Sequence, residues 1–128
     1  MTLSHYRQDF ARWGEAQAAR YLEALGYEVL VRNFTAQHAE VDLICRFLDG
    51  LVFVEVKTRS NQAYGPGEQS VDKAKLRAIK RAVYAYLENH HPDAEIGWQI
   101  DIVVVEGNFG CLEPQFLHFQ NVGASLDE

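Results

Sequence analysis

Apolar residues recur along this chain with two different spacings, which predict helices and strands in alternation. From Phe10 to Leu25 small and apolar residues return every three or four positions, which is typical of a helix with one buried face. The same spacing predicts a second helix from about Val71 to Asn89, with Ser70 as its N-cap. Runs rich in β-branched and aromatic residues predict strands at Tyr27 to Asn33, Val41 to Phe47, Leu51 to Val56, Trp98 to Val105 and Phe116 to Phe119. This order predicts an α/β domain with a central mixed β-sheet flanked by helices.

The segment from Val41 to Val56 has the pattern of a β-hairpin with charges on one face. Asp49-Gly50 is a dipeptide that favours the positive φ angles of a tight hairpin loop. With these two residues as the loop, three pairs are expected across the hairpin: Leu48 with Leu51, Ile44 with Glu55, and Asp42 with Lys57. Because side chains alternate along a strand, Asp42, Glu55 and Lys57 then share one face.

Asp42 and Glu55 are diagonal neighbours in this register, with Cα atoms about 7 to 8 Å apart. Two carboxylates at that separation can bind one cation, and Lys57 stands beside them. The alternative is an edge hairpin whose charged face points to water, with Lys57 neutralising Asp42. Burial of such a cluster costs several kcal/mol per charge, on the order seen for unpaired buried ions, unless the charges are paired or bind a metal. Phosphodiester hydrolysis with Mg²⁺ or Mn²⁺ uses this combination of two carboxylates and an ammonium group.

Asp42 followed by Glu55-Val56-Lys57 resembles the Asp…(Asp/Glu)-x-Lys signature of restriction-endonuclease-like nucleases. From about Phe10 to Phe119 the chain more closely resembles the YraN-type family of small bacterial proteins, which is similar to archaeal Holliday-junction resolvases. The segments that carry this resemblance are Gly14-Glu15, Ala39 to Ile44, Val52 to Arg59, Lys75 and Asp101 to Val103. The chain departs from the family pattern at Ala39, where Gly is usual, and at Gln99, where Arg commonly precedes Asp101.

The resemblance implies a restriction-endonuclease-like core and a nuclease-type metal site. Asp42, Glu55 and the backbone carbonyl of Val56 would bind Mg²⁺ or Mn²⁺, and Lys57 would position the attacking water. Two further carboxylates are candidates. Glu15 lies one residue off the apolar stripe of the first helix and could add a third carboxylate, whereas a solvated helix surface is its ordinary alternative. Glu40 precedes Asp42 by two residues, so its side chain is expected on the same face. It could belong to the metal site, lie beside it, or be a charge that faces solvent.

Candidate nucleic-acid contacts follow the Glu-x-Lys strand. Arg59 begins a segment from Thr58 to Ser70 that is expected to be a loop, and Gln69 lies near its end as a weak candidate. On the second helix Lys75 falls beside the apolar stripe, so its ammonium group could reach the acidic hairpin face or a bound phosphate. Lys73 belongs to a basic strip on another side of that helix, for which simple solvation is the alternative.

The net charge of −6 argues against nonspecific coating of nucleic acid, but the charge is unevenly distributed. All twelve Lys and Arg residues lie in positions 1–81 against ten acids, a balance of +2, whereas positions 82–128 carry −8. Because electrostatic footprints are local, a basic patch can still bind phosphate. Nucleic acid is therefore the expected partner, DNA more than RNA, and analogy with resolvases suggests a homodimer.

The length of 128 residues predicts one endonuclease-like domain, ordered over about 10–120, with a frayed tail from Asn121. Two cysteines without metal-ligand spacing fit a reducing compartment, and the sequence has neither a signal peptide nor a run long enough to span a membrane, so a cytoplasmic protein is expected. Three functions remain open at this point: a metal-dependent nuclease, a nucleic-acid-binding module that does not cleave, and an interaction protein in DNA processing.

Overall fold

The computed structural model describes residues 3–60, 72–90 and 96–123. Its elements follow in the order α1 (Leu3–Ala24), β1 (Glu28–Ala36), β2 (Ala39–Phe47), β3 (Gly50–Arg59), α2 (Lys73–His90), β4 (Trp98–Glu106) and β5 (Gln115–Phe119). The five strands form one sheet in sequence order, antiparallel except for the parallel pair β3 and β4. Parallel neighbours require a crossover connection, and α2 lies within it. The predicted α/β class with a mixed sheet is confirmed, and the arrangement is consistent with a restriction-endonuclease-like core.

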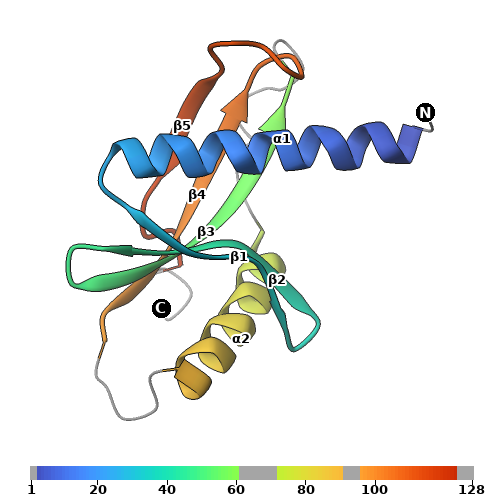
Figure 1. Ribbon diagram of the computed structural model, residues 1–128. Coiled ribbons are helices and arrows are strands. Elements are labelled where there is room, and N and C mark those ends of the chain that lie inside the picture. The colour runs from blue at the N-terminus through green and yellow to red at the C-terminus, as the bar shows by residue number, and fades with distance from the viewer. Residues whose placement is uncertain (1–2, 61–71, 91–95, 124–128) are drawn as a thin grey trace.

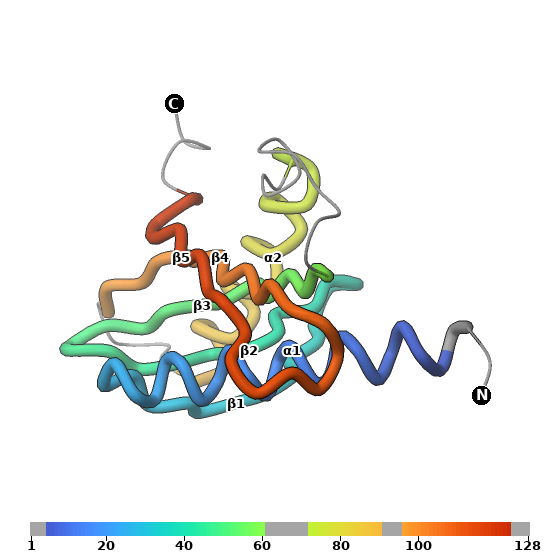
Figure 2. Tube along the Cα trace, turned by 90° about the horizontal axis from the view of Figure 1, so that it is seen from above, coloured from blue at the N-terminus to red at the C-terminus, as the bar shows by residue number. Residues whose placement is uncertain are grey.

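The two helices lie on opposite faces of the sheet (Figures 1 and 2). On the α1 face Leu22 packs with Leu43, Val54 and Val103, all of them buried. The α2 face is a second apolar core built from Ile44, Phe53, Leu76, Ile79, Val83 and Tyr86. The stripe predicted for the second helix is thus confirmed as its buried face. Each strand of the central hairpin supplies side chains to both cores, which explains why β2 and β3 are apolar on both sides.

The predicted hairpin register is wrong by one residue on each strand. Leu48 and Asp49 form the loop, with Leu48 at φ 55°, and Gly50 is already the first paired residue of β3, opposite Phe47. The observed pairs are Leu43 with Val54, Ile44 with Phe53, Cys45 with Val52 and Arg46 with Leu51. Gly50 is required for a different reason than the turn, because a Cβ on it would lie only 2.9 Å from the carbonyl oxygen of Gly97. By alternation alone, this shift would leave the expected sharing of faces unchanged.

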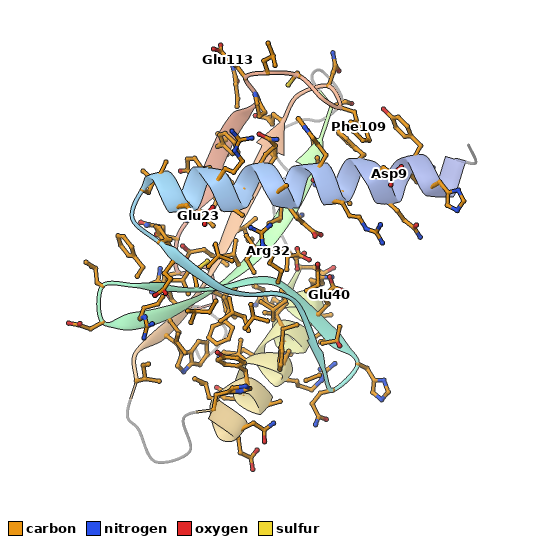
Figure 3. All side chains as sticks on the ribbon, viewed as in Figure 1. Asp9, Glu23, Arg32, Glu40, Phe109 and Glu113 are labelled. Atoms are coloured by element: carbon orange, nitrogen blue, oxygen red, sulfur yellow. The ribbon has the colours of Figure 1, made fainter. Side chains whose placement is uncertain are left out.

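Helix α1 begins at Leu3, seven residues before the predicted start at Phe10. The additional turns are held by rings, because Tyr6, Phe10 and Trp13 lie on one face of the helix and all contact Phe109. Figure 3 shows Phe109, from the segment between β4 and β5, above the N-terminal half of α1. A contact with a segment about a hundred residues away cannot be seen in local periodicity.

Several predicted boundaries also differ from the structure. The expected loop from Thr58 onward begins later, because β3 continues to Arg59. The predicted N-cap Ser70 lies outside the described residues, and Asp72 caps α2 instead, its Oδ1 accepting a 2.8 Å hydrogen bond from the Lys75 N–H. The tail is not frayed at its start, since the Asn121 N–H donates to Asp101 and Gly123 is buried. Neither described helix has the length and apolar character needed to cross a membrane.

Candidate metal centre

The predicted acidic pair lies where β2 and β3 separate. Their ladder of pairs runs from Phe47–Gly50 to Leu43–Val54. One step further, the backbone N–H of Val56 donates a 2.8 Å hydrogen bond to Asp42 Oδ2. A side-chain carboxylate therefore satisfies a strand donor that would otherwise seek a backbone carbonyl. Continuing the observed register places Asp42 opposite Glu55 rather than opposite Lys57, so the two acids are direct and not diagonal neighbours.

Burial and repulsion together perturb this pair. Asp42 is only 7% exposed, and the side chain of Glu55 is 12% exposed. Loss of hydration raises the pKa of Asp42 to about 9, and the neighbouring Glu55 carboxylate adds to the rise, while the Val56 N–H opposes it. Glu55 Oε2 is buried and accepts no hydrogen bond from any described residue, although Lys75 Nζ approaches it to 3.8 Å. The pair thus combines a carboxyl group that burial and its neighbour favour in the protonated form with a carboxylate that forms an ion pair with Lys75.

Two more carboxylates converge on Asp42. Oxygen atoms of Glu15, Glu40 and Asp42 all lie within 4.8 Å of one another. Asn33 joins the first two, because its Nδ2 donates to Glu15 Oε1 at 3.0 Å and to Glu40 Oε1 at 3.1 Å. In Figure 3 Glu40 lies between α1 and the tip of the β1–β2 hairpin. Glu15 and Glu40, for which a solvent-facing position was the alternative, therefore both lie beside Asp42. Each accepts a hydrogen bond from the side-chain amide of Asn33.

A local irregularity of β1 and β2 creates this convergence. Val31 and Phe34 both pack on the α2 core although residues three apart in a regular strand face opposite sides, and Val41 and Ile44 do the same on β2. Asn33, at φ 53°, lies at this change of face, in a left-handed conformation that asparagine tolerates better than most residues. Sequence reasoning missed Asn33. The predicted strand ends at Asn33, a poor strand former, whereas the observed strand continues through it to Ala36.

Gly14 determines how closely α1 approaches the site. A Cβ atom on Gly14 would overlap the side chain of Thr58 on β3. The missing side chain lets the helix lie directly on the strand, and the next residue, Glu15, is thereby brought to Asp42. In the Gly14-Glu15 dipeptide, Gly14 thus allows the close approach of the helix, and Glu15 supplies a carboxylate near Asp42.

The predicted cations have different environments. Lys57 is half-buried and, by strand alternation, lies on the same side of β3 as Glu55, whereas the Val56 side chain packs on the α1 core. Arg59 is half-buried at the end of β3, and its carbonyl oxygen accepts a 2.9 Å hydrogen bond from the Gly107 N–H. Lys75 meets Glu55, and Lys73 is exposed at the start of α2. Gln69 lies outside the described residues, so the structure brings together the acids and Lys75 but says nothing of that amide.

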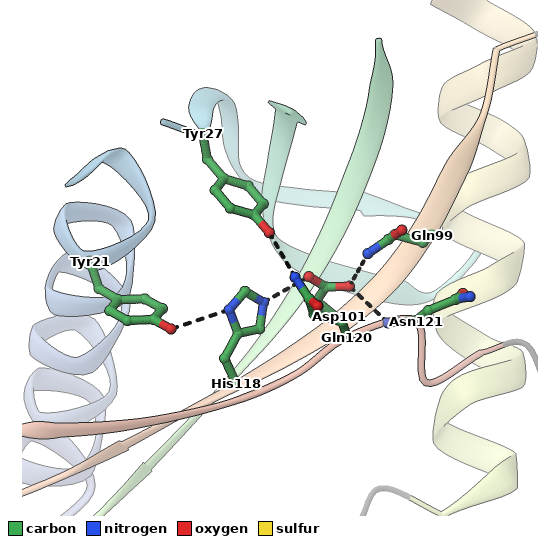
Figure 4. Close-up of polar contacts among 7 residues, drawn as sticks. All are labelled: Tyr21, Tyr27, Gln99, Asp101, His118, Gln120 and Asn121. Carbon is green, nitrogen blue, oxygen red and sulfur yellow. Dashed lines mark hydrogen bonds and ion pairs between the residues drawn. The ribbon is translucent and has the colours of Figure 1, made fainter. Parts of the chain in front are cut away.

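Asp101, on β4, belongs to a segment that carries the family resemblance, but no role was predicted for it. Its carboxylate is fully buried and accepts hydrogen bonds from Gln99 Nε2 at 2.8 Å and from the Asn121 N–H at 3.0 Å, and it pairs with His118 Nε2 at 2.7 Å (Figure 4). Gln99, in the place of the expected Arg, thus still donates to Asp101. This network lies apart from the acids around Asp42, and no sequence pattern indicated it.

Comparison with known proteins identifies the family of this chain. Residues 14–105 match the model of the uncharacterised protein family UPF0102. A UPF0102 protein of Chloroflexus aurantiacus is 36% identical over 115 residues, which covers 90% of each chain. Relatives from Parafrankia, 43% identical over 73% of this chain and 80% of the relative, and from Syntrophomonas wolfei, 42% identical over 64% and 71%, carry the same family name. The chain therefore belongs to the UPF0102 family, the YraN-type family that its motifs resemble.

Proposed function

We propose that this protein is a metal-dependent nuclease-like protein whose centre is formed by Asp42 and Glu55. The observation that carries the proposal is the buried carboxylate pair, in which Asp42 has a raised pKa and Glu55 Oε2 has no hydrogen-bond donor. Structural acids in a fold core are normally compensated by donors or cations. A buried carboxylate pair with a strongly raised pKa is typical of a functional site.

The donor set fits a hard divalent cation. Carboxylate oxygens are the ligands that Mg²⁺ and Mn²⁺ prefer, and Asp42, Glu55 and the Val56 carbonyl are the residues that would hold one. Glu15 and Glu40 would bind it or its water ligands, because their oxygens lie within 4.8 Å of Asp42. Such an ion, when bound, polarises a phosphodiester and lowers the pKa of a water molecule. Sulfur or imidazole ligands are absent from this group of described residues, which argues against zinc.

The remaining residues of the centre act on substrate and water. Lys57, on the Glu55 side of β3, orients the attacking water or offsets the charge that develops on the phosphate. Lys75 now neutralises Glu55, and it becomes available to a phosphate oxygen once another cation compensates that carboxylate. Arg59 and Lys73 extend the positive side of the site toward a polynucleotide. The balance of +2 in positions 1–81 supports nucleic acid as the substrate class, with DNA preferred and a homodimer as the form that suits branched DNA.

A nucleic-acid-binding module without cleavage is the second candidate. The ion pair of Lys75 with Glu55 favours it, because a cation from the chain itself already compensates part of the acidic charge. Metal dependence separates the two candidates.

The experiment compares wild type with Glu55→Gln for cleavage of branched, flapped and single-stranded DNA and RNA in Mg²⁺, Mn²⁺ and chelator. Binding of the same substrates is measured in chelator. Glu113→Gln is the matched control, since it makes the same change on an exposed residue far from Glu40 (Figure 3). We expect metal-dependent cleavage that Glu55→Gln abolishes and Glu113→Gln retains, with binding intact in both. Binding without cleavage by wild type in any metal would support the module instead.

A further inference from the structure

A cavity of about 500 Å³ lies at the end of the sheet away from the acids. It is formed where β3 and β4 begin, so its lining residue Leu51 lies four positions before Glu55, about 13 Å along the strand at about 3.3 Å per residue. This volume falls within the range of about 300–1,000 Å³ that is usual for small-molecule sites. The cavity is therefore a separate place on the molecule, with room for a ligand of its own.

Its walls combine aromatic rings with amide side chains. Three rings contribute, Tyr27, Phe47 and Trp98, and three amides, Gln99, Gln120 and Asn121. Tyr27 and Phe47 are stacked on each other, with centroids 4.0 Å apart and planes at 10°. None of the described residues that line the cavity carries a formal charge.

The side-chain amides of Gln99 and Gln120 are held by the hydrogen bonds drawn in Figure 4. Asp101 Oδ1 accepts hydrogen bonds from both Gln99 Nε2 and the Asn121 N–H. The nitrogen of the Gln99 amide therefore points toward Asp101. The carbonyl oxygen of Gln99 is then left as an acceptor. Gln120 Nε2 donates to the Tyr27 hydroxyl at 3.3 Å, which leaves a second amide oxygen in the same lining. Preorganised polar groups of this kind favour one ligand orientation and reduce the entropy lost on binding.

These features define the ligand by its chemistry. A lining without charge offers no counter-ion to a phosphate, a carboxylate or an ammonium group, so the part of the ligand that enters is neutral. Aromatic rings in the lining favour a planar ring. Amide oxygens favour a ring edge with N–H donors. Glutamine and asparagine amides pair with the edges of nucleobases in this way, and bases stack on aromatic side chains.

We propose that this cavity binds a single nucleobase with an exocyclic amino group, stacked near Tyr27 and Phe47 and hydrogen-bonded to Gln99 and its neighbouring amides. The base can belong to a free nucleoside or nucleotide, or to an unpaired position of a strand, with its phosphates outside the cavity. This site does not depend on the nuclease proposal, because none of its residues belongs to the acidic centre.

The test uses Trp98 as a reporter. Trp13 and Trp98 are the two tryptophans, so Trp13→Phe leaves the cavity residue as the sole indole. In that background, adenosine, cytidine and AMP are titrated by fluorescence, followed by single-stranded oligo(dA) and oligo(dC). Uridine lacks an exocyclic amino group, and N-acetylphenylalanine amide offers a ring and an amide without a base edge.

Two variants alter the cavity by different routes. Gln99→Arg can still donate to Asp101 but brings charge and volume into the lining, and Gln115→Arg makes the same change on exposed β5 as a control. Gly97→Leu fills the cavity, since a Cβ added at Gly97 meets nothing within 4 Å. Far-ultraviolet circular dichroism and thermal unfolding verify that each variant is folded. If Gln99→Arg does not fold, the result for Gly97→Leu decides the test.

We expect saturable quenching by adenosine or cytidine, or by their oligonucleotides, that weakens at least tenfold in Gln99→Arg and Gly97→Leu and is unchanged in Gln115→Arg. Nucleosides binding as tightly as oligonucleotides identify a free nucleotide as the ligand, and binding by oligonucleotides alone identifies a base within a strand. The proposal is overturned if no ligand quenches saturably, if the two cavity variants bind as wild type does, or if uridine or N-acetylphenylalanine amide binds equally well.

Discussion

The Val56 backbone N–H donates its hydrogen bond to the side chain of Asp42, 14 residues earlier in the chain, at 2.8 Å. This bond fixes one carboxylate oxygen at the point where β2 leaves β3, and Glu55 immediately precedes the donor. The bond therefore holds the Asp42 carboxylate beside the peptide unit between Glu55 and Val56. The acidic pair is a property of the backbone junction as much as of the residue types.

The raised pKa of Asp42 predicts a pH dependence of stability. Burial and the Glu55 charge raise the pKa from 3.8 to about 9 in the folded state, so the folded protein binds this proton more tightly than the unfolded chain. The contribution of Asp42 is fully present below about pH 4 and is lost progressively up to about pH 9. Asp42→Asn does not titrate at this position, so its stability should not show this loss as the pH rises. Thermal unfolding of both proteins from pH 4 to 9 should show wild type losing stability relative to the variant, and a constant difference would contradict the shift.

Asn33 is expected to hold Glu15 and Glu40 together. Asn33→Asp keeps the shape and tolerates the positive φ angle, but replaces a shared donor with a third negative charge. We expect a loss of unfolding free energy of at most about 1 kcal/mol by chemical denaturation, because both hydrogen bonds are exposed to solvent. Asn108→Asp, on an exposed residue, is the control.

A divalent cation should reverse part of that loss, because the added carboxylate joins the acidic group. The denaturation series is repeated with Mn²⁺ and with chelator. A deficit of Asn33→Asp that is equal in both conditions would show that Asn33 has only a structural role.

The contact of Gly14 with Thr58 predicts a steric effect. Gly14→Ala inserts a methyl group into the Thr58 side chain, and overpacking of this kind costs about 1–3 kcal/mol. Gly97→Ala is the matched control, since its methyl group meets nothing. The double variant Gly14→Ala/Thr58→Gly should be more stable than the sum of the single changes predicts, as measured by a double-mutant cycle. Strict additivity would mean that α1 does not rest on Thr58.

Lys75 is expected to contact phosphate. Lys75→Ala should weaken nucleic-acid binding for all sequences alike and reduce the slope of log affinity against log salt by about one. Binding is measured by fluorescence anisotropy at several salt concentrations with Ca²⁺ present, because Lys75 is available to phosphate only when another cation compensates Glu55. Arg46→Ala is the control because Arg46 lies in an exposed ion pair with Glu28, which contributes at most about 1 kcal/mol to stability. Equal salt slopes for wild type and Lys75→Ala would show that Lys75 does not contact phosphate and that nucleic acid binds to another face.

Most of the fold followed from periodicity, and the acids followed from a motif. The hairpin register did not, because Asp49-Gly50 has the composition of a loop while Gly50 is needed for the approach of Gly97. Asn33 was missed because the change of face in β1 and β2 interrupts the alternation on which strand reading depends. The network around Asp101 joins residues from β4 and β5, and single-sequence patterns carry no record of such pairing.

The central claim is that Asp42 and Glu55 bind a divalent cation, and isothermal titration calorimetry with Mn²⁺ tests it most directly. At pH 7.5 we expect one saturable site per chain in wild type, an affinity at least tenfold lower in Glu55→Gln because one negative charge is removed, and an unchanged affinity in Glu113→Gln. No saturable binding by wild type, or equal affinity in wild type and Glu55→Gln, would contradict the claim.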